Sequence, residues 1–400
     1  MTKNKPEKSP SKISSKKGLA AMGPAHFAED GMHTAIPILV PALIKEYSLS
    51  YFIAGLLGFS FRGTAAIANP IIAWRSEQST NRRLLLIVGL VIYVASLSLF
   101  TVAPNYMWIL ILTAIAGACS AVYHPQALTL LRETTGNPMS SIVGIHGTIG
   151  GVGVVVSPII ISYLTIHFGW RVAIPILFVP IVAISIPLVW IYFKEPKAAP
   201  PTKFSFQLFG GKMYLALLGY QSLMAVALSG LRFFLPAYLM TIRELTFTTS
   251  GTIFSIMSVA TLVGFPLGGF LASRFNRKAL IVTIPIVFSV FYGLFLSIET
   301  HMAIWVTCLF IARLASSTVH PILVTALGDT PSIPLATAIS MLHAATAAIS
   351  AFAPLVMGAV ADYAGLNLAM MILIIPAIIA VILSVTLISS SFVHGNKLEE

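Results

Sequence analysis

Two histidines and two acidic residues stand close together in the first apolar stretch of the chain. They are His26, Glu29, Asp30 and His33. On a helix, His26, Asp30 and His33 share one face, and Glu29 and His33 are neighbours one turn apart. Carboxyl and imidazole groups in an apolar setting can exchange protons. They can also serve the helix itself, because acids near a helix start stabilise its first turn.

Both roles stay open for Asp30, whereas capping of the first turn is the better interpretation for Glu29. His26 is expected in the interfacial layer, at the end of the helix.

Three arginines interrupt later apolar stretches: Arg62, Arg232 and Arg313. Arginine holds carboxylate and phosphate-like groups through two parallel hydrogen bonds, which suits it to binding an anion. A buried arginine can equally be neutralised by an acid. For Arg62 we predict a structural ion pair with Asp30 or Glu29 on a neighbouring helix. The acids near Arg232 and Arg313 all fall at the ends of apolar stretches, so we predict anion binding there.

The dipeptide His124-Pro125 recurs as His320-Pro321, 196 residues later. A proline inside a helix frees backbone carbonyl groups and kinks the helix. The two histidines could stabilise equivalent kinks, and their symmetry favours this role. They could also contact a substrate or exchange protons near neutral pH. Both therefore remain candidate substrate-binding residues.

The same offset relates further landmarks of the two halves. Gly55 maps onto Gly251, Pro70 onto Pro266, and Pro158 onto Pro354. One register kept across about half of the chain indicates two homologous halves. Internal repeats of this kind are typical of secondary transporters.

The composition excludes a water-soluble protein. Of the 400 residues, 57% are hydrophobic and only 9% are charged, and the mean hydropathy is +0.91. A soluble domain carries about 25% charged residues because its surface faces water. We therefore predict an integral membrane protein surrounded by the lipid bilayer. The net charge of +11 reflects basic loops and does not indicate nucleic-acid binding.

Twelve apolar runs are each long enough to cross the roughly 30 Å hydrocarbon core as a helix. The runs cover residues 24–44, 51–74, 84–103, 107–131, 141–166, 171–193, 212–240, 248–272, 279–298, 302–327, 335–362 and 367–391. The predicted fold class is an all-α polytopic membrane protein, with twelve transmembrane helices in two pseudo-symmetric six-helix bundles. The short alternating strands of a membrane β-barrel are not visible.

The predicted bundles occupy residues 24–193 and 212–391, and residues 194–211 form a cytoplasmic linker between them. Residues 1–23 are rich in Lys, Ser and Pro and are expected to form a disordered basic tail. Residues 392–400 form a second tail.

Lysine and arginine are concentrated on one side of the predicted bundle. On that side 18 of these residues flank the runs, against Lys45, Arg171 and Arg243 on the other. By the positive-inside rule both termini are cytoplasmic. We expect a multi-pass protein of the plasma (inner) membrane.

A stripe of small residues follows one face of the fifth run. His146, Gly150, Gly153 and Ser157 fall at i, i+4, i+7 and i+11, directly before Pro158. Small residues let helices pack closely. We predict that this stripe packs against a helix of the other half, at an interface where the two halves rock.

Several segments carry a resemblance to a known family. The segment Gly269–Lys278 and its first-half copy around Glu77 resemble the loop signature of the major facilitator superfamily, a glycine and an acid followed by basic residues. The second copy lacks the acid and the first lacks the glycine. Residues 150–158 resemble the Gly-rich, Pro-terminated motif of antiporters in that superfamily. HPQA at 124–127 and IHGTIGGVGVVVSP at 145–158 resemble its fosmidomycin-resistance-type efflux branch.

The resemblance covers nearly the whole chain and implies proton-coupled export of a small anionic or amphipathic compound. In this superfamily the first, fourth, seventh and tenth helices line a central cavity. Proton coupling then falls to Asp30, with Glu29 in support. Substrate binding falls to Arg232, Arg313, His124 and His320. Gating or packing between the halves falls to His146, Gly150, Gly153, Ser157, Pro158, Gly269 and Glu77.

Two alternatives stay open. The same fold would serve a proton-coupled importer of an organic anion or a sugar-like metabolite, and a membrane sensor would bind a ligand without moving it.

No nucleotide-binding loop or enzyme signature is present, so we expect neither enzymatic activity nor a cofactor. Outside the first-helix group no cluster has metal-ligand spacing, so no metal site is expected. We expect a monomer.

Overall fold

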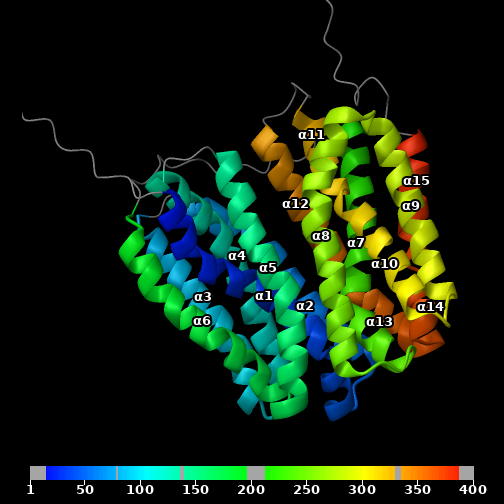
Figure 1. Cartoon of the computed structure of the whole chain (residues 1–400), viewed down its shortest axis with the longest axis horizontal. Coiled ribbons are helices and arrows are strands. Elements are labelled where there is room, and N and C mark those ends of the chain that lie inside the picture. Colours follow the sequence, from blue (N-terminus) through cyan, green and yellow to red (C-terminus); the bar gives the residue numbers. More distant parts are fainter. Residues whose placement is uncertain (1–14, 78–79, 136–138, 196–211, 329–334, 387–400) are drawn as a thin grey trace, which may run out of the picture.

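The computed structural model describes residues 15–77, 80–135, 139–195, 212–328 and 335–386. Within these ranges the chain forms helices and short connections, with no strand. The helices cross the molecule back and forth, and the described chain begins and ends at the same end of the bundle (Figure 1). We call this the N-terminal end, and the other the opposite end. The all-α polytopic class predicted from the sequence is confirmed.

The first half contains six long segments. They are α1 (Ser15–Tyr47), α2 (Tyr51–Glu77), α3 (Arg82–Ser98) continued by the 3-10 helix η1 (Leu99–Val102), α4 (Tyr106–Thr135), α5 (Met139–Phe168) and α6 (Trp170–Tyr192).

The second half has the same six segments, but its last three are each broken into two helices. The unbroken helices are α7 (Lys212–Thr241), α8 (Phe247–Arg274) and α9 (Arg277–Ser297). The broken segments are α10 (Met302–Ser317) with α11 (Val319–Gly328), α12 (Leu335–Ala351) with α13 (Ala353–Ala364), and α14 (Leu366–Met371) with α15 (Ile374–Thr386).

Eleven of these segments are long and apolar enough to cross a membrane. The twelfth, α1, has 33 residues and ample length. Its hydropathy is lowered by the histidines and acids that it carries between positions 26 and 33. The segment with the weakest membrane signal is therefore the one with the most ionisable side chains.

Helix α1 begins at Ser15, well before the predicted start at residue 24. The expectation of a disordered tail over residues 1–23 is therefore wrong from Ser15 onward. The reason is packing, because Leu19 and Met22 are buried in the bundle. Residues 1–14 lie outside the described part of the chain.

The start of the predicted linker is tied to the first half. The carboxylate of Glu195 accepts a hydrogen bond from Arg83 Nε at 3.1 Å and another from the backbone N–H of Arg82 at 2.6 Å. Residues 196–211 of that linker, and the predicted tail 392–400, lie outside the described part.

The internal repeat is visible in the backbone. Gly169 and Gly365, 196 positions apart, both have a positive φ, 87° and 88°. Each lies in the turn between the fifth and sixth segments of its half. With ψ values of 151° and 154° they occupy a region open essentially to glycine alone. The two halves thus use the same turn at the same place.

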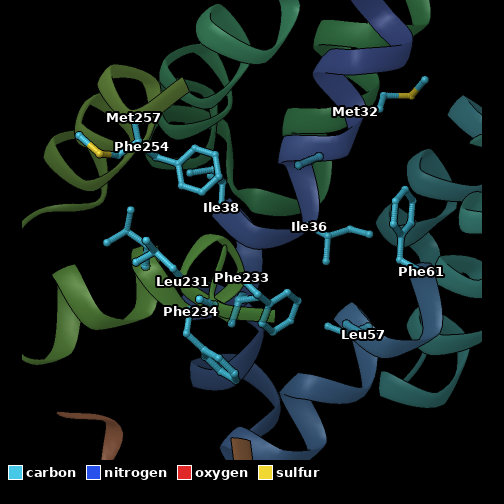
Figure 2. Close-up of a cluster of buried hydrophobic side chains, with 14 of the residues drawn as sticks. Met32, Ile36, Ile38, Leu57, Phe61, Leu231, Phe233, Phe234, Phe254 and Met257 are labelled. Atoms are coloured by element: carbon cyan, nitrogen blue, oxygen red, sulfur yellow. The ribbon is translucent and has the colours of Figure 1, made fainter. Parts of the chain in front are cut away.

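The two halves meet through an apolar core. Figure 2 shows buried side chains of α1, α2, α7 and α8 gathered at this junction. The labelled members are Met32, Ile36, Ile38, Leu57, Phe61, Leu231, Phe233, Phe234, Phe254 and Met257. The acids and arginines described below lie around this core.

Glycines bring the two halves into close contact toward the opposite end. Gly55 of α2 lies against the backbone of Pro354, and Gly358 of α13 lies against the backbone of Tyr51 and Phe52. Helices α5 and α8 also pack across the junction, and their ribbons diverge toward the N-terminal end (Figure 1). In this conformation the halves are held together most closely at the opposite end.

Candidate functional site

Glu29 and Asp30 lie in the middle of α1. The helix begins at Ser15 and has no acid in its first turn, so the capping interpretation of these residues is wrong. Glu29 is completely buried, whereas the Asp30 side chain is 22% exposed. Both carboxylates therefore sit well inside the bundle.

Each carboxylate lies between imidazole rings. Glu29 Oε1 is 2.9 Å from Nε2 of His33, one turn along α1. Asp30 Oδ2 is 3.2 Å from Nε2 of His26, one turn in the other direction. His124 of α4 approaches both acids, with its Nε2 3.3 Å from Glu29 Oε2 and 3.7 Å from Asp30 Oδ1. We call His26, Glu29, Asp30, His33 and His124 the acid–histidine cluster.

His26 does not lie at the end of its helix, where the interfacial layer was expected, because α1 already begins at Ser15. His26 is only 2% exposed. Its ring stacks on His146 of α5, with 3.7 Å between the ring centroids, and on Tyr123 of α4 at 5.3 Å. Its Nδ1 lies 2.8 Å from the His146 backbone carbonyl oxygen. Because a carbonyl only accepts hydrogen bonds, Nδ1 donates, and Nε2 is the ring nitrogen that faces other partners.

The small-residue stripe of α5 packs against α1 of the same half, and the predicted contact with the other half is wrong for this face. Gly150 lies against the Asp30 carboxylate and the His26 ring, and Gly153 lies against the backbone of Phe27. Ser157 meets Gly31 one step further along the stripe. The stripe therefore makes room for the acid–histidine cluster.

A different face of α5 meets the other half. Gly151 lies against Leu262 of α8, and the backbone of Pro158 lies against Gly251. Of the predicted interface residues on α5, Pro158 thus contacts the second half.

Arg62 does not form the predicted ion pair with Asp30 or Glu29. Its Nη2 donates a hydrogen bond to Oγ of Ser350 on α12, at 3.1 Å. The side chain of Arg62 therefore points across the junction toward the second half. Among the described residues no acid lies within ion-pair distance of it.

Two cavities near the junction share Arg232. The first has about 430 Å³ of atom-free space, and its polar lining includes His33, Arg62 and Ser229. The second has about 580 Å³, and its polar lining includes Ser258, Thr261 and Arg313. Arg232 also donates from Nη2 to the His33 backbone carbonyl at 3.4 Å. No acidic side chain of the described chain lines either cavity, so both have a cationic lining.

The four predicted substrate residues are not brought together. Arg232 and Arg313 line one cavity. His124 lies in the acid–histidine cluster. His320 faces His343 of α12, with 3.0 Å between the two Nε2 atoms and stacked rings 4.5 Å apart. The matched His-Pro dipeptides therefore have different surroundings.

Of the two loop-signature residues, only Gly269 can be described, and it makes no gating contact within the described part of the chain. Gly269 is exposed, and a Cβ there would meet nothing within 4 Å. Glu77 ends α2, and its side chain lies outside what the structure describes.

Three polar residues, Tyr123 in the first half and Ser350 and Asp362 at the junction, had been given no role from the sequence. Tyr123 stacks on His26, Ser350 accepts from Arg62, and Asp362 caps α2 from the second half. The adjacency of Tyr123 to His124 was a usable signal. Neither Ser350 nor Asp362 has a distinctive sequence context.

Comparisons with known proteins agree with this architecture. The family model described as Major Facilitator Superfamily matches residues 23–332 and, in a second overlapping match, residues 217–397. The MFS-type transporter YfnC of Bacillus subtilis (strain 168) is 23% identical over 151 residues, 38% of this chain and 37% of the relative. The fosmidomycin resistance protein of Escherichia coli (strain K12) is 21% identical over 151 residues, again 38% of this chain and 37% of the relative. The matched region thus spans little more than a third of either relative.

Solved structures show the same fold at low identity. A bacterial homolog of the human lysosomal transporter Spinster, inward-facing and occupied, superposes with a TM-score of 0.79 at 16% identity, covering 96% of this chain and 98% of that one. The nucleoside transporter NupG gives 0.82 at 12% identity, covering 93% and 100%.

The resemblance seen in the sequence is confirmed by the family match and by the weak relation to the fosmidomycin resistance protein. The twelve helical segments of the described chain are arranged in two halves, with ionisable groups around their junction, and share the fold of these solved structures. The chain belongs to the Major Facilitator Superfamily of membrane transporters.

Proposed function

We propose that this transporter exports a small anionic or amphipathic compound in exchange for protons, by alternating access as a monomer. Asp30 is the proton-coupling residue, with Glu29 in support. Arg232 and Arg313 bind the anionic group of the substrate. His124 and His320 remain the candidate substrate contacts outside the two cavities.

The enclosure of the two acids supports a coupling role. An ionisable side chain at the centre of a membrane costs about 2.5–3.5 kcal/mol on insertion scales, so it persists where it has a function or a partner. Asp30 is partly exposed and lies 3.7 Å from His124, whose side chain is 49% exposed. A proton can therefore reach Asp30 directly from outside the packed core, whereas the Glu29 carboxylate is only 1% exposed and is approached through His33 or His124.

The cationic lining of the cavities supports an anionic substrate. Arg62, Arg232 and Arg313 line cavities that contain no described acid. The three arginines are half-buried, and no acid of the described chain lies within ion-pair distance of them. Such arginines attract a carboxylate or phosphate-like group, which they can hold through paired hydrogen bonds. The apolar remainder of each lining suits an amphipathic molecule.

We place the protein in the plasma (inner) membrane. The distribution of Lys and Arg supports an orientation with both termini in the cytoplasm. The conformation, closed at the opposite end, is then inward-facing. The relative from Escherichia coli is named for drug resistance, which favours export over import.

Proton movement in proteoliposomes tests this proposal. The purified chain is reconstituted, a pH gradient is imposed, and an internal pH dye is followed while phosphonates, carboxylates and neutral drugs are added. We expect proton flux that depends on an anionic or amphipathic compound and runs opposite to it. Flux in the same direction would establish an importer, and binding without movement a sensor.

Two variants locate the coupling residue. Asp30→Asn should abolish gradient-driven transport while retaining substrate binding. Glu299→Gln, which changes an exposed acid after α9, should leave transport unchanged. Gradient-driven transport that persists in Asp30→Asn would refute the assignment.

A further inference from the structure

We propose that His26, Glu29, Asp30 and His124 bind one divalent transition-metal ion, such as Zn²⁺. One donor atom from each of these residues lies within 4.8 Å of all the others. Two imidazole nitrogens and two carboxylate oxygens form a complete four-ligand set for zinc. This inference is independent of the proposed transport direction and substrate.

The spacing of the donor atoms fits a tetrahedral ion. Zinc binds imidazole nitrogen and carboxylate oxygen at about 2.0–2.2 Å, which places neighbouring donors about 3.3–3.6 Å apart. His26 Nε2 and Asp30 Oδ2 are 3.2 Å apart, and His124 Nε2 and Glu29 Oε2 are 3.3 Å apart. His124 Nε2 and Asp30 Oδ1 are 3.7 Å apart. These distances involve both oxygens of Asp30, and the remaining donor pairs lie within 4.8 Å, so the donors close in by up to about an ångström to hold an ion.

Two buried donor atoms lack a hydrogen bond within the described part of the chain. They are His26 Nε2 and Glu29 Oε2, whose contacts are the ion-pair distances to Asp30 and His124 given above. His26 Nδ1 is committed to the His146 carbonyl oxygen, so Nε2, which faces the Asp30 carboxylate, is the ring nitrogen that remains for a metal ion. An imidazole nitrogen and a carboxylate oxygen at this distance are held together by a cation between them, either a proton on Nε2 or a metal ion. A metal ion bound by all four residues would contact both His26 Nε2 and Glu29 Oε2.

The surroundings hold the ligands in place. Residues that hydrogen-bond a metal ligand fix its orientation and strengthen its binding. His33 bonds the second oxygen of Glu29 at 2.9 Å, and the His146 carbonyl oxygen fixes the ring of His26 at 2.8 Å. Gly150 leaves the space that the Asp30 carboxylate and the His26 ring occupy.

The donor set selects the kind of ion. Imidazole and carboxylate ligands together suit Zn²⁺ and the neighbouring ions Mn²⁺, Fe²⁺ and Co²⁺. Mg²⁺ and Ca²⁺ prefer shells of oxygen alone. Asp30 and His124 are partly exposed, which gives the ion a way in. A carboxylate oxygen that carries a proton cannot hold the ion, so proton and metal exclude each other at Asp30.

Metal binding by the full-length protein tests the proposal. The chain is purified in detergent with a tag that contains no histidine, stripped with a chelator, and titrated with Zn²⁺ by calorimetry. We expect one ion per chain. His124→Ala and Asp30→Asn should each weaken binding at least tenfold. His320→Ala, the matched change at the equivalent histidine of the second half, should leave binding unchanged.

Co²⁺ gives an independent readout of geometry. Co²⁺ bound to the cluster should show the intense visible absorption of a tetrahedral site, and His26→Gln should abolish it. Zn²⁺ should raise the melting temperature of the unaltered chain and of His320→Ala, but not that of Asp30→Asn. Melting of the apo variants checks that each one folds.

The proposal is overturned if the unaltered chain binds no Zn²⁺ at micromolar concentrations. It is also overturned if His320→Ala weakens binding as much as His124→Ala, because the ion would then lie elsewhere.

Discussion

Asp362, near the end of α13, accepts a hydrogen bond from the backbone N–H of Tyr51, the first residue of α2, at 2.7 Å. Its other carboxylate oxygen accepts from the N–H of Phe52 at 2.9 Å. One acid of the second half thus caps a helix of the first half. The first N–H groups of a helix have no partner within it, so a carboxylate there is stabilising.

Replacing this acid should loosen the opposite end of the bundle. Asp362→Ala removes the carboxylate that caps two N–H groups of α2 and should cost about 1 kcal/mol of stability. We expect faster amide hydrogen exchange in the first turn of α2 and a lower melting temperature. Asp362→Asn keeps an acceptor and should show a smaller change. Unchanged exchange in Asp362→Ala would mean that the apolar and glycine contacts alone hold this end.

Gly150 should tolerate no larger side chain. A Cβ there would overlap the Asp30 carboxylate and the His26 ring. Gly150→Ala should therefore displace Asp30 and abolish proton-coupled flux in proteoliposomes. Gly147→Ala, on the same helix, is the control, because a Cβ there meets nothing within 4 Å. If both variants transport normally, the position of Asp30 does not matter for coupling.

The helices could be predicted from the sequence because lipid imposes a simple rule. A run of about 20 apolar residues satisfies its backbone only as a helix. The start of α1 could not be predicted because residues 15–23 form a short stretch with two lysines, which does not read as part of an apolar run. Their helical form depends on burial of Leu19 and Met22 by other helices, which sequence patterns do not contain.

Half of the acid–histidine cluster was also visible in the sequence. The i,i+4 spacing on α1 pairs His26 with Asp30 and Glu29 with His33, as the structure shows. The contact of His124 with these acids could not be predicted, because it depends on how α4 packs against α1.

Symmetry was a poor guide to the roles of the histidines. His124 and His320 are equivalent in sequence, yet only His124 has acid partners within the described chain. The second half carries Met224, Ala225 and Val226 where α1 carries its acids. Without those acids, His320 turns to His343 instead.

The small-residue stripe illustrates a further limit. Small residues indicate a close approach of two helices but do not name the partner. Helix α5 has two such faces, and the stripe through Gly150 faces α1 while Gly151 faces α8.

The symmetric turns make a prediction about stability. Gly169→Ala and Gly365→Ala each force a Cβ into a backbone conformation open essentially to glycine, at a cost of order 1–3 kcal/mol. Both variants should melt at lower temperature and by similar amounts, since φ and ψ are nearly the same. The strain is local, so binding of Zn²⁺ to the folded variants should not change. A lower melting temperature in only one of the two variants would show that the two turns do not contribute equally to stability.

Arg232 should contribute more to anion binding than Arg313, because it lines both cavities and Arg313 lines one. Arg232→Gln should weaken binding of phosphonates and carboxylates by more than tenfold, measured as the ligand-induced rise in melting temperature of the purified chain. Arg313→Gln should weaken binding less. Arg274→Gln removes a positive charge at the exposed end of α8 and tests whether the net charge of the protein alone causes anion binding. It should leave anion binding unchanged. Equal losses in Arg232→Gln and Arg274→Gln would mean that anions are attracted by the overall charge of the protein, and the cavities would not be the binding site.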